Sequence, residues 1–448
     1  MSELDRQVIG ARADELLPGL AAQGVEVVAM TFVDNSGVVR TKAVPLRRLA
    51  AAAASGIGAS NSFDFFGFDD SICTGKYSSG PVGDLRLHLD LERLTVLAAQ
   101  PGWAWAPADR RDQDGAVHPM DQRSLAKEAV RQLAERGLTA KLAFEVEWVV
   151  TAENAPDELA GRGPAYGYAR LSRHSDYLRA IVSALDNQGV AVEQIHPEYA
   201  AGQFELSVGA EDPVGAADTS VLVRETIRVV SGMHGLRASF TPQFSVGGVG
   251  NGGHVHLSVW DGERNLFGGG DGQFGMTATA ETFSAGILDR LPALLAVGAP
   301  SVVSYLRLEP HRWAGAFAVW GLENREAAVR LIAGTSPNLE VKCFDHTANP
   351  YLVVAALLFA GMAGETALPD PIDVDPGSLS DDERHGLGIR RLPATLADAV
   401  SAFEADIVLH DCFGAPLATT LMDVRKAEIQ RFAGSTPDQI TAAYRWAH

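Results

Sequence analysis

Pairs of ionisable side chains occur at short, regular spacing in this sequence. Glu145 and Glu147 are two residues apart, so on a strand they share one face while Phe144, Val146 and Trp148 share the other. Two carboxylates held side by side repel each other, which is tolerable on a solvated face or around a metal cation. The pair is therefore either the wet face of a strand or part of a metal site.

Two further pairs have the residue types of metal ligands. Glu198 and Glu205 flank a turn-like centre, so a bend could bring them toward one point. His254 and His256 are again two apart, and the glycine-rich segment 247–253 before them lets a ligand approach backbone N–H groups. A structural role for the histidines is the alternative to metal ligation.

Basic residues gather between positions 304 and 334 of a chain that is acidic overall. Arginine is suited to binding carboxylates and phosphates, and surface ion pairs are the alternative. Downstream, Glu340 and Lys342 place an acid and a base on one strand face. The arginines of the segment are Arg307, Arg312, Arg325 and Arg330.

Charge and composition argue against several classes of protein. A net charge of −19 over 448 residues gives a surface field that repels nucleic acids and anionic lipids, although solubility alone would also favour acidity. Three scattered cysteines make neither a disulfide framework nor a zinc-thiolate site. No stretch is typical of a signal peptide or a bilayer-spanning helix. We therefore expect a cytoplasmic protein with no nucleic-acid or membrane partner.

Periodicity and turn signals predict the elements that position these residues. The aromatic side chains in the long Gly- and Ser-rich stretch before residue 81 disfavour disorder, so this stretch is interpreted as a functional loop. The predicted N-terminal elements are a helix at 12–24, a hairpin of strands 25–34 and 38–46 around Asn35–Gly37, a loop at 56–81 and a strand at 85–97.

A polar segment between residues 107 and 119, broken by Gly and Pro, marks a predicted domain boundary, and the chain length also favours two domains. Beyond it, strand-like segments alternate with helices. The predicted strands are 142–150, 203–208, 254–260 and 338–345, and the predicted helices are 121–137, 174–188, 213–233, 278–297 and 350–366.

The order of the motifs is more specific than any one of them. Two glutamates, a His-Pro-Glu segment with a second glutamate seven residues on, the histidine pair, the arginines, and the segments LEVK and ANPY follow one another. In this order they resemble the glutamine synthetase family, from about residue 20 to the end. The resemblance implies an α+β fold: a small N-terminal β-grasp domain (1–110), then a catalytic domain (111–448) whose curved antiparallel sheet, flanked by helices, surrounds a funnel-shaped site.

The resemblance also implies a set of metal ligands. Oxygen-rich donor sets with at most one imidazole suit Mg²⁺ or Mn²⁺ better than zinc, and converging glutamates near ATP and an acid substrate need two or more dications. By similarity, one ion is held by Glu147, Glu198 and Glu205, and the other by Glu145, His254 and Glu340.

Further matches point to the substrates, which are ATP, glutamate and an amine. Arg307 and Arg325 match arginines that hold the acid substrate and the transferring phosphoryl group. The implied reaction is phosphoryl transfer from ATP to the γ-carboxylate of glutamate, then attack by an amine on the acyl phosphate. The residues matched to the nucleotide side are Glu193, His256, Ser258 and Arg330.

One departure from the family concerns the amine. Trp313 ends the segment Pro310–Trp313, where ammonium-using members carry a flap glutamate. An indole cannot accept a proton, but its face can hold a cation or the apolar stem of an amine. The chain therefore resembles the γ-glutamyl-amine ligases of the family, especially γ-glutamylpolyamine ligases. The alternatives are an ammonium-using synthetase and a catalytically silent relative with a regulatory or binding role.

Other departures affect the remaining substrate contacts. The second ammonium-side acid of the family comes from a neighbouring subunit, and its nearest match here is Asp64, with Asp69 and Asp70 as rivals. The family's substrate-loop asparagine is displaced within Gly250–His254, which leaves acid substrates other than glutamate open. The resemblance further implies a homo-oligomer of rings, a dodecamer or a hexamer, with each site between adjacent subunits.

Overall fold

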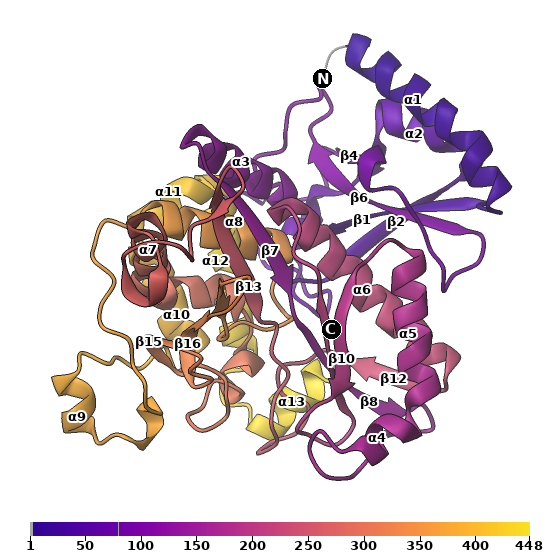
Figure 1. Cartoon of the computed structure of the whole chain (residues 1–448). Coiled ribbons are helices and arrows are strands. Elements are labelled where there is room, and N and C mark those ends of the chain that lie inside the picture. The colour runs from indigo at the N-terminus through magenta and orange to yellow at the C-terminus, as the bar shows by residue number, and fades with distance from the viewer. Residues whose placement is uncertain (1–2, 79) are drawn as a thin grey trace.

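The N-terminal part of the chain is a small mixed sheet covered by two helices. The computed structural model describes residues 3–78 and 80–448. The elements of this part are α1 (Glu3–Ala22), β1 (Val27–Val33), β2 (Val39–Pro45), α2 (Leu49–Ser55), β3 (Ile57–Ala59), β4 (Leu85–Leu89), β5 (Thr95–Val96) and β6 (Trp103–Arg111). The strand order is β2-β1-β6-β4-β3, with β5 on β6, and β1 runs parallel to β6. Figure 1 shows β1, β2, β4 and β6 of this sheet beside α1 and α2.

The β-grasp pairing and the predicted hairpin are confirmed, with Val33 opposite Val39 across the turn. The first helix differs from the prediction because it begins at Glu3 rather than at residue 12. Its first turns contain good helix formers, and Ile9 packs on the core formed by Ala13 and its neighbours. β6 ends at residue 111, so the domain boundary predicted after residue 110 falls at the end of a strand.

Where the structure describes it, the predicted loop 56–81 contains short elements. It contains β3 and a 3₁₀ turn, η2 (Asn61–Phe65). Phe68 stacks on Tyr444, with ring centroids 3.9 Å apart, and also lies against Phe432. The loop is therefore attached to the C-terminal helices, and this aromatic side chain serves packing.

The catalytic part is built on two sheets. Its strands are β7 (Thr139–Phe144), β8 (Val146–Ala152), β9 (Ala155–Leu159), β10 (Val192–Pro197), β11 (Gln203–Val208), β12 (Leu236–Ser239), β13 (Val255–Asp261), β14 (Arg264–Asn265), β15 (Phe317–Leu322), β16 (Ala327–Ile332) and β17 (Asn338–Val341). One sheet has the order β10-β11-β8-β12 with β9 on β8, and the other β14-β13-β17-β16-β15 with β7 on β13. The pairing is antiparallel as predicted, except that β15 and β16 are parallel.

The segment predicted as a single strand at 142–150 is two strands in different sheets. β7 pairs with β13, whereas β8 pairs with β11 and β12. Between them, the Glu145 N–H donates to the His254 carbonyl, and the Glu147 N–H donates to His346 Nε2. Alternation of side chains continues through the change of partner, so the sequence pattern does not reveal it. Glu145 thereby stands at the junction of the two sheets.

Most of the remaining helices flank these sheets, whereas α9 (Asp381–Gly386) lies on a protruding segment (Figure 1). The others are α3 (Gln122–Glu135), α4 (Tyr168–Arg173), α5 (Ser175–Asn187), α6 (Pro213–Met233), α7 (Ala278–Gly298), α8 (Pro350–Met362), α10 (Leu396–Ala405), α11 (Ile407–Phe413), α12 (Ala415–Arg431) and α13 (Pro437–Tyr444). All residues of α8 are buried, and it contacts α3, α6 and α7 in the main core. The five predicted helices of this part are confirmed, with ends shifted by a few residues. Among the described residues, no helix is long and apolar enough to cross a membrane.

Candidate active site

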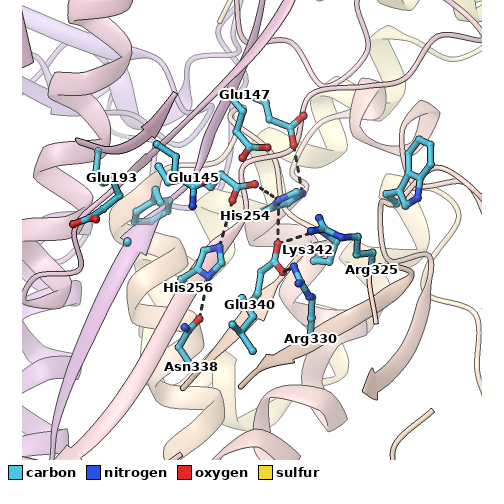
Figure 2. Close-up of a pocket in the computed structure, with 18 of the residues that line it drawn as sticks. Glu145, Glu147, Glu193, His254, His256, Arg325, Arg330, Asn338, Glu340 and Lys342 are labelled. Atoms are coloured by element: carbon cyan, nitrogen blue, oxygen red, sulfur yellow. Dashed lines mark hydrogen bonds and ion pairs between the residues drawn. The ribbon is translucent and has the colours of Figure 1, made fainter. Parts of the chain in front are cut away.

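A cavity of about 1040 Å³ is lined by strands of both catalytic sheets and contains nearly all of the predicted site residues (Figure 2). Its walls come from β7, β8, β10, β11, β13, β16 and β17 and from the segments between them. The predicted residues that line it are Glu145, Glu147, Glu193, Glu198, Glu205, His254, His256, Ser258, Arg307, Trp313, Arg325, Arg330 and Glu340.

Strand register aligns one row of ionisable side chains across the first sheet. His196 of β10 is opposite Glu205 of β11, which is opposite Glu147 of β8, so the three side chains share a face. His196 Nε2 lies 3.1 Å from Glu205 Oε1 and its Nδ1 lies 3.8 Å from Glu198 Oε1. The Tyr166 hydroxyl donates to Glu198 Oε1 at 2.6 Å. His196 was not among the predicted ligands, although its spacing of two from Glu198 could have indicated it.

A second row crosses the other sheet. Arg330 of β16 is opposite Glu340 of β17, which is opposite His256 of β13. Arg330 Nη1 donates to Glu340 Oε2 at 3.2 Å and Lys342 Nζ donates to Glu340 Oε1 at 3.0 Å. Burial alone would raise the pKa of Glu340, but the Lys342 ammonium and the neighbouring histidines hold this pKa at about 2. Glu340 is therefore a carboxylate held in its charged form.

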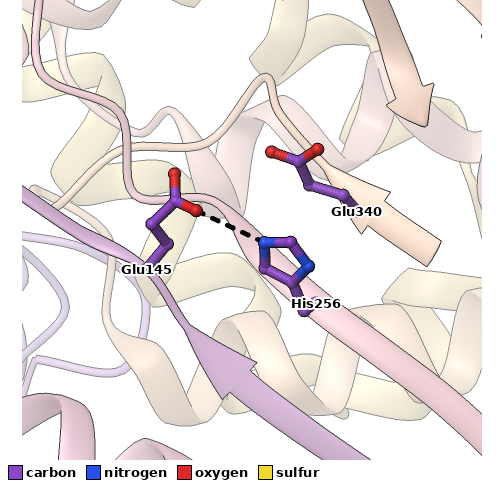
Figure 3. Close-up of side chains that lie close together, drawn as sticks. All are labelled: Glu145, His256 and Glu340. Atoms are coloured by element: carbon purple, nitrogen blue, oxygen red, sulfur yellow. Dashed lines mark ion pairs between the residues drawn. The ribbon is translucent and has the colours of Figure 1, made fainter. Parts of the chain in front are cut away.

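Glu145 connects the two rows. His254 Nδ1 lies 2.6 Å from Glu145 Oε1 and 3.3 Å from Glu340 Oε1, so the predicted ligand set of Glu145, His254 and Glu340 is brought together. His256 Nε2 approaches Glu145 Oε2 to 3.5 Å, as Figure 3 shows. Against the effect of burial, His254 and His256 hold the pKa of Glu145 well below its usual value.

Glu147 is fixed by polar groups around it. Its Oε2 accepts hydrogen bonds from Gln203 Nε2 at 3.0 Å and from the Gly252 N–H at 2.9 Å. Gln203 is fully buried and also donates to the carbonyl of Gly250 and to Asn251 Oδ1. Sequence reasoning missed Gln203, because an isolated amide carries no motif. Asn251 donates its amide to the Thr241 carbonyl, so the displaced loop asparagine serves the fold.

The donor set fits divalent cations. Burial and the neighbouring acids Glu145, Glu147 and Glu198 raise the pKa of Glu205 to about 11, so an ionised carboxylate at this position needs a cation. Carboxylates and imidazoles are suitable donors. The close groups of candidate ligands are Glu145, Glu147 and His254; Glu145, His256 and Glu340; and His196, Glu198 and Glu205. This grouping places Glu147 with Glu145 and His254, whereas the sequence-based grouping places it with Glu198 and Glu205.

Two of the arginines differ in how firmly they are held. Arg307 is buried, and its guanidinium donates to the carbonyls of Phe344 and Lys342 and lies 3.1 Å from His254 Nε2. Arg325 is exposed on the turn between β15 and β16. Figure 2 shows Arg325 and Arg330 on one side of the carboxylates and Glu193 on the other. A substrate between them would therefore lie between negative and positive walls.

Glu428 of α12 supports the turn that leads to Arg307. It accepts a hydrogen bond from the Val302 N–H at 2.7 Å, at the start of the 3₁₀ turn η5 (Val302–Leu306). Burial raises the pKa of Glu428 from 4.5 to about 7. Between these two values the folded protein binds a proton that the unfolded chain lacks, so stability falls as the pH rises from 4.5 to 7.

We therefore predict that Glu428→Gln stabilises the protein at pH 8, where the wild-type carboxylate is ionised and buried. The midpoint of thermal unfolding at pH 8 should rise by roughly 2–4 °C, and the difference from wild type should vanish at pH 4.5. Thermal unfolding at both pH values measures this. Glu365→Gln, an exposed site, is the matched control. A lower midpoint at pH 8 would mean that the Val302 hydrogen bond requires the charge.

The predicted nucleotide-side residues all line the cavity, with Glu193 and Arg330 on opposite sides of the carboxylates (Figure 2). His256 Nδ1 lies 3.0 Å from Asn338 Oδ1. Burial alone would lower the pKa of His256, but the carboxylates of Glu145 and Glu340 raise this pKa to about 9. Ser258 Oγ accepts a hydrogen bond from Trp260 Nε1 at 2.8 Å. These contacts orient polar groups that an adenine nucleotide could use, while the nucleotide role of these residues stays a prediction.

Trp313 lies in the cavity wall, where its ring centroid is 4.9 Å from that of Tyr199. Asp64, in contrast, is outside the lining. Its carboxylate is fully buried, accepts a hydrogen bond from Arg110 at 2.6 Å and lies 3.4 Å from His118 Nε2. Within one chain Asp64 is thus a structural ion-pair partner, and its predicted role toward the amine is not tested by this arrangement.

Two curved sheets thus surround a buried cluster of glutamates and histidines with arginines opposite, an arrangement that suits divalent cations and an anionic substrate. The family model "Glutamine synthetase, catalytic domain" matches residues 119–444. The chain belongs to the glutamine synthetase family, and it is a ligase of that family. Members of this family use ATP and divalent metals.

Individual relatives refine this assignment. A γ-glutamylpolyamine synthetase, GlnA3, of Streptomyces coelicolor is 51% identical over 98% of this chain and 97% of the relative. A glutamine synthetase of Halobacterium salinarum is 30% identical over 96% of this chain and 95% of the relative. Among solved structures, "GmaS/ADP complex-Conformation 1" is 30% identical, with a TM-score of 0.84 over 94% of this chain and 97% of that one.

Proposed function

We propose that this protein joins the γ-carboxylate of glutamate to an organic amine, with a polyamine as the natural acceptor, and converts ATP to ADP and phosphate. The observation that carries the proposal is the exposed indole of Trp313 in the cavity wall, at the position of the family's ammonium-side glutamate. The likeness to a γ-glutamylpolyamine synthetase over the whole chain supports it.

The site would hold two Mg²⁺ or Mn²⁺ ions through Glu145, Glu147, Glu198, Glu205, His254 and Glu340. When bound, such ions supply Lewis-acid activation of the γ-phosphate and charge neutralisation between ATP and the acid substrate. Lys342 and Arg330 hold Glu340 in its charged form, and Gln203 and the Gly252 N–H orient Glu147. The chain thereby presents ionised, oriented carboxylates before the substrates arrive.

The arginines would act on the acid substrate. Arg307 is fixed by two backbone carbonyls, which suits a group that positions a carboxylate, while Arg325 reaches in from a turn and is free to contact the transferring phosphoryl group. Attack by the amine on γ-glutamyl phosphate then forms the amide and releases phosphate. Retention of every predicted ligand argues against the silent relative.

The experiment is phosphate release from Mg²⁺-ATP and glutamate with ammonium, methylamine, ethanolamine, putrescine, spermidine or spermine as acceptor. We expect turnover with the di- and polyamines, and at least tenfold lower kcat/KM with ammonium, because Trp313 offers ammonium no carboxylate. If ammonium is the best acceptor, the protein is an ordinary glutamine synthetase. In Trp313→Glu, the ratio of kcat/KM for ammonium to that for putrescine should rise, whereas Trp313→Gln controls for loss of the ring alone.

We further propose a cytoplasmic homo-oligomer, a dodecamer or hexamer, in which the loop at 56–81 of one subunit approaches the cavity of the next. In that loop Asp70 is exposed apart from an ion pair with Arg40, so it is available to a neighbouring site in a way that the buried Asp64 is not. Mass measurement in solution tests the assembly.

A further inference from the structure

Tyr199 and Trp313 form an aromatic pair on the cavity wall, although they come from distant segments. Tyr199 directly follows Glu198 in the turn between β10 and β11, and Trp313 lies in the segment before β15. Their rings are 4.9 Å apart at 52°, and the two residues are 49% and 41% exposed. Aromatic side chains that line a cavity and stay this exposed are not explained by core packing.

The backbone of this segment is held in an unfavourable conformation. Trp313 has φ 55° and His311 has φ 61°, in the left-handed region that costs a non-glycine residue about 1 kcal/mol or more. Two contacts hold it there: Glu326 accepts the Trp313 N–H at 2.9 Å, and Arg312 donates to the carbonyls of Gly247 and Gly248. The indole is therefore presented to the cavity by the surrounding structure.

The charge near the pair suits a cation. Glu326, which is not among the proposed metal ligands, accepts the Trp313 N–H at 2.9 Å and so places a carboxylate near the indole. The nearby Arg312 guanidinium is engaged with backbone carbonyls. The faces of Tyr and Trp attract ammonium groups by about 0.5–2 kcal/mol, and their apolar surface packs on methylene groups.

We propose that Tyr199 and Trp313 are a subsite for the second, protonated nitrogen of a di- or polyamine acceptor. The inference rests on the proposed function and adds the basis of its selectivity. The nitrogen that attacks the acyl phosphate must be neutral, whereas the distal amine keeps its proton at neutral pH and needs its own partner. Ammonium and monoamines have no second cation, so they lack the cation–π attraction that the subsite offers a di- or polyamine.

The test compares putrescine with n-butylamine, which has the same four-carbon chain and one nitrogen fewer. Initial rates at saturating ATP and glutamate give kcat/KM for each amine with wild type, Tyr199→Phe and Tyr199→Leu. We expect wild type to prefer putrescine about tenfold, the Phe variant to keep this preference, and the Leu variant to lose it through a higher KM for putrescine. The kcat/KM for n-butylamine should fall by a smaller factor than that for putrescine, because n-butylamine loses only apolar contact, and the KM for ATP should stay constant.

Several outcomes would overturn the inference. If Tyr199→Leu lowers kcat/KM equally for both amines, the ring shapes the site but does not bind the second ammonium group. Equal use of the two amines by wild type would contradict the subsite while leaving organic-amine ligation intact. Turnover with ammonium alone would overturn the proposed function itself. Trp313→Leu tests the other ring with the same two amines. If the rings act together, the double variant should lose little more of the preference for putrescine than either single variant does.

Discussion

Glu145→Gln is expected to lower kcat about 1000-fold and to remove one bound Mn²⁺ per subunit. Glu145 is the carboxylate at the junction of the two sheets, and its oxygens lie 2.6 Å from His254 and 3.5 Å from His256. The amide keeps the size of the side chain but removes the charge and one strong metal donor. The predicted rate loss corresponds to about 4 kcal/mol of transition-state stabilisation.

Mn²⁺ binding followed by electron paramagnetic resonance measures the stoichiometry directly and without turnover. Glu263→Gln is the matched control, because Glu263 is an exposed acid on the β13–β14 turn outside the cavity lining. This control should bind as many ions as wild type. If Glu145→Gln retains full Mn²⁺ stoichiometry, Glu145 is not a ligand, and its close histidine contacts are structural ion pairs.

Arg325→Ala should have an effect of similar size, about a 1000-fold loss of kcat with little change in the affinity for ADP. Arg325 is exposed on the turn between β15 and β16, and it faces the cavity near Glu340 and Arg330 (Figure 2). A guanidinium in this position can offset charge that develops on the transferring phosphoryl group, which is a contribution made in the transition state rather than in the ground state.

Arg325→Lys separates charge from geometry, because an ammonium keeps the charge but cannot form the bidentate contact. The kcat of Arg325→Lys should be higher than that of Arg325→Ala and at least about tenfold lower than that of wild type. Single-turnover formation of ADP from ATP and glutamate, before any amine is added, shows whether the first step, which forms γ-glutamyl phosphate, is affected. If the rate of this first step is unchanged in Arg325→Ala, the arginine acts in the second step, the attack of the amine.

Several features were predictable from the sequence because they depend on local spacing. An interval of two residues predicts that Glu145 and Glu147, and His254 and His256, share a strand face, and the family resemblance marks Glu145, Glu147 and His254 as ligands; the structure brings all four into one cavity. The Asn35–Gly37 turn also follows from local chemistry. The apolar run predicted as a helix at 350–366 is confirmed by α8, which ends at Met362.

Tertiary structure alone decided how these residues are grouped. The spacing of side chains along a strand is the same whichever strand it pairs with, so the sequence could not show that the chain leaves one sheet and enters another at Glu145. Register between strands brought His196 opposite Glu205 and Arg330 opposite Glu340, and the spacing of residues along the chain does not determine this register.

The same reason explains what the sequence missed on the amine side. Trp313 was singled out by its place in a motif, but its partner Tyr199 is more than a hundred positions away, and the strained backbone that presents the indole depends on Glu326 and Arg312. The sequence determined which chemical groups the protein has and the family to which they belong. Long-range pairing of strands and loops decided which groups meet, because only the folded chain brings residues of distant segments within contact distance.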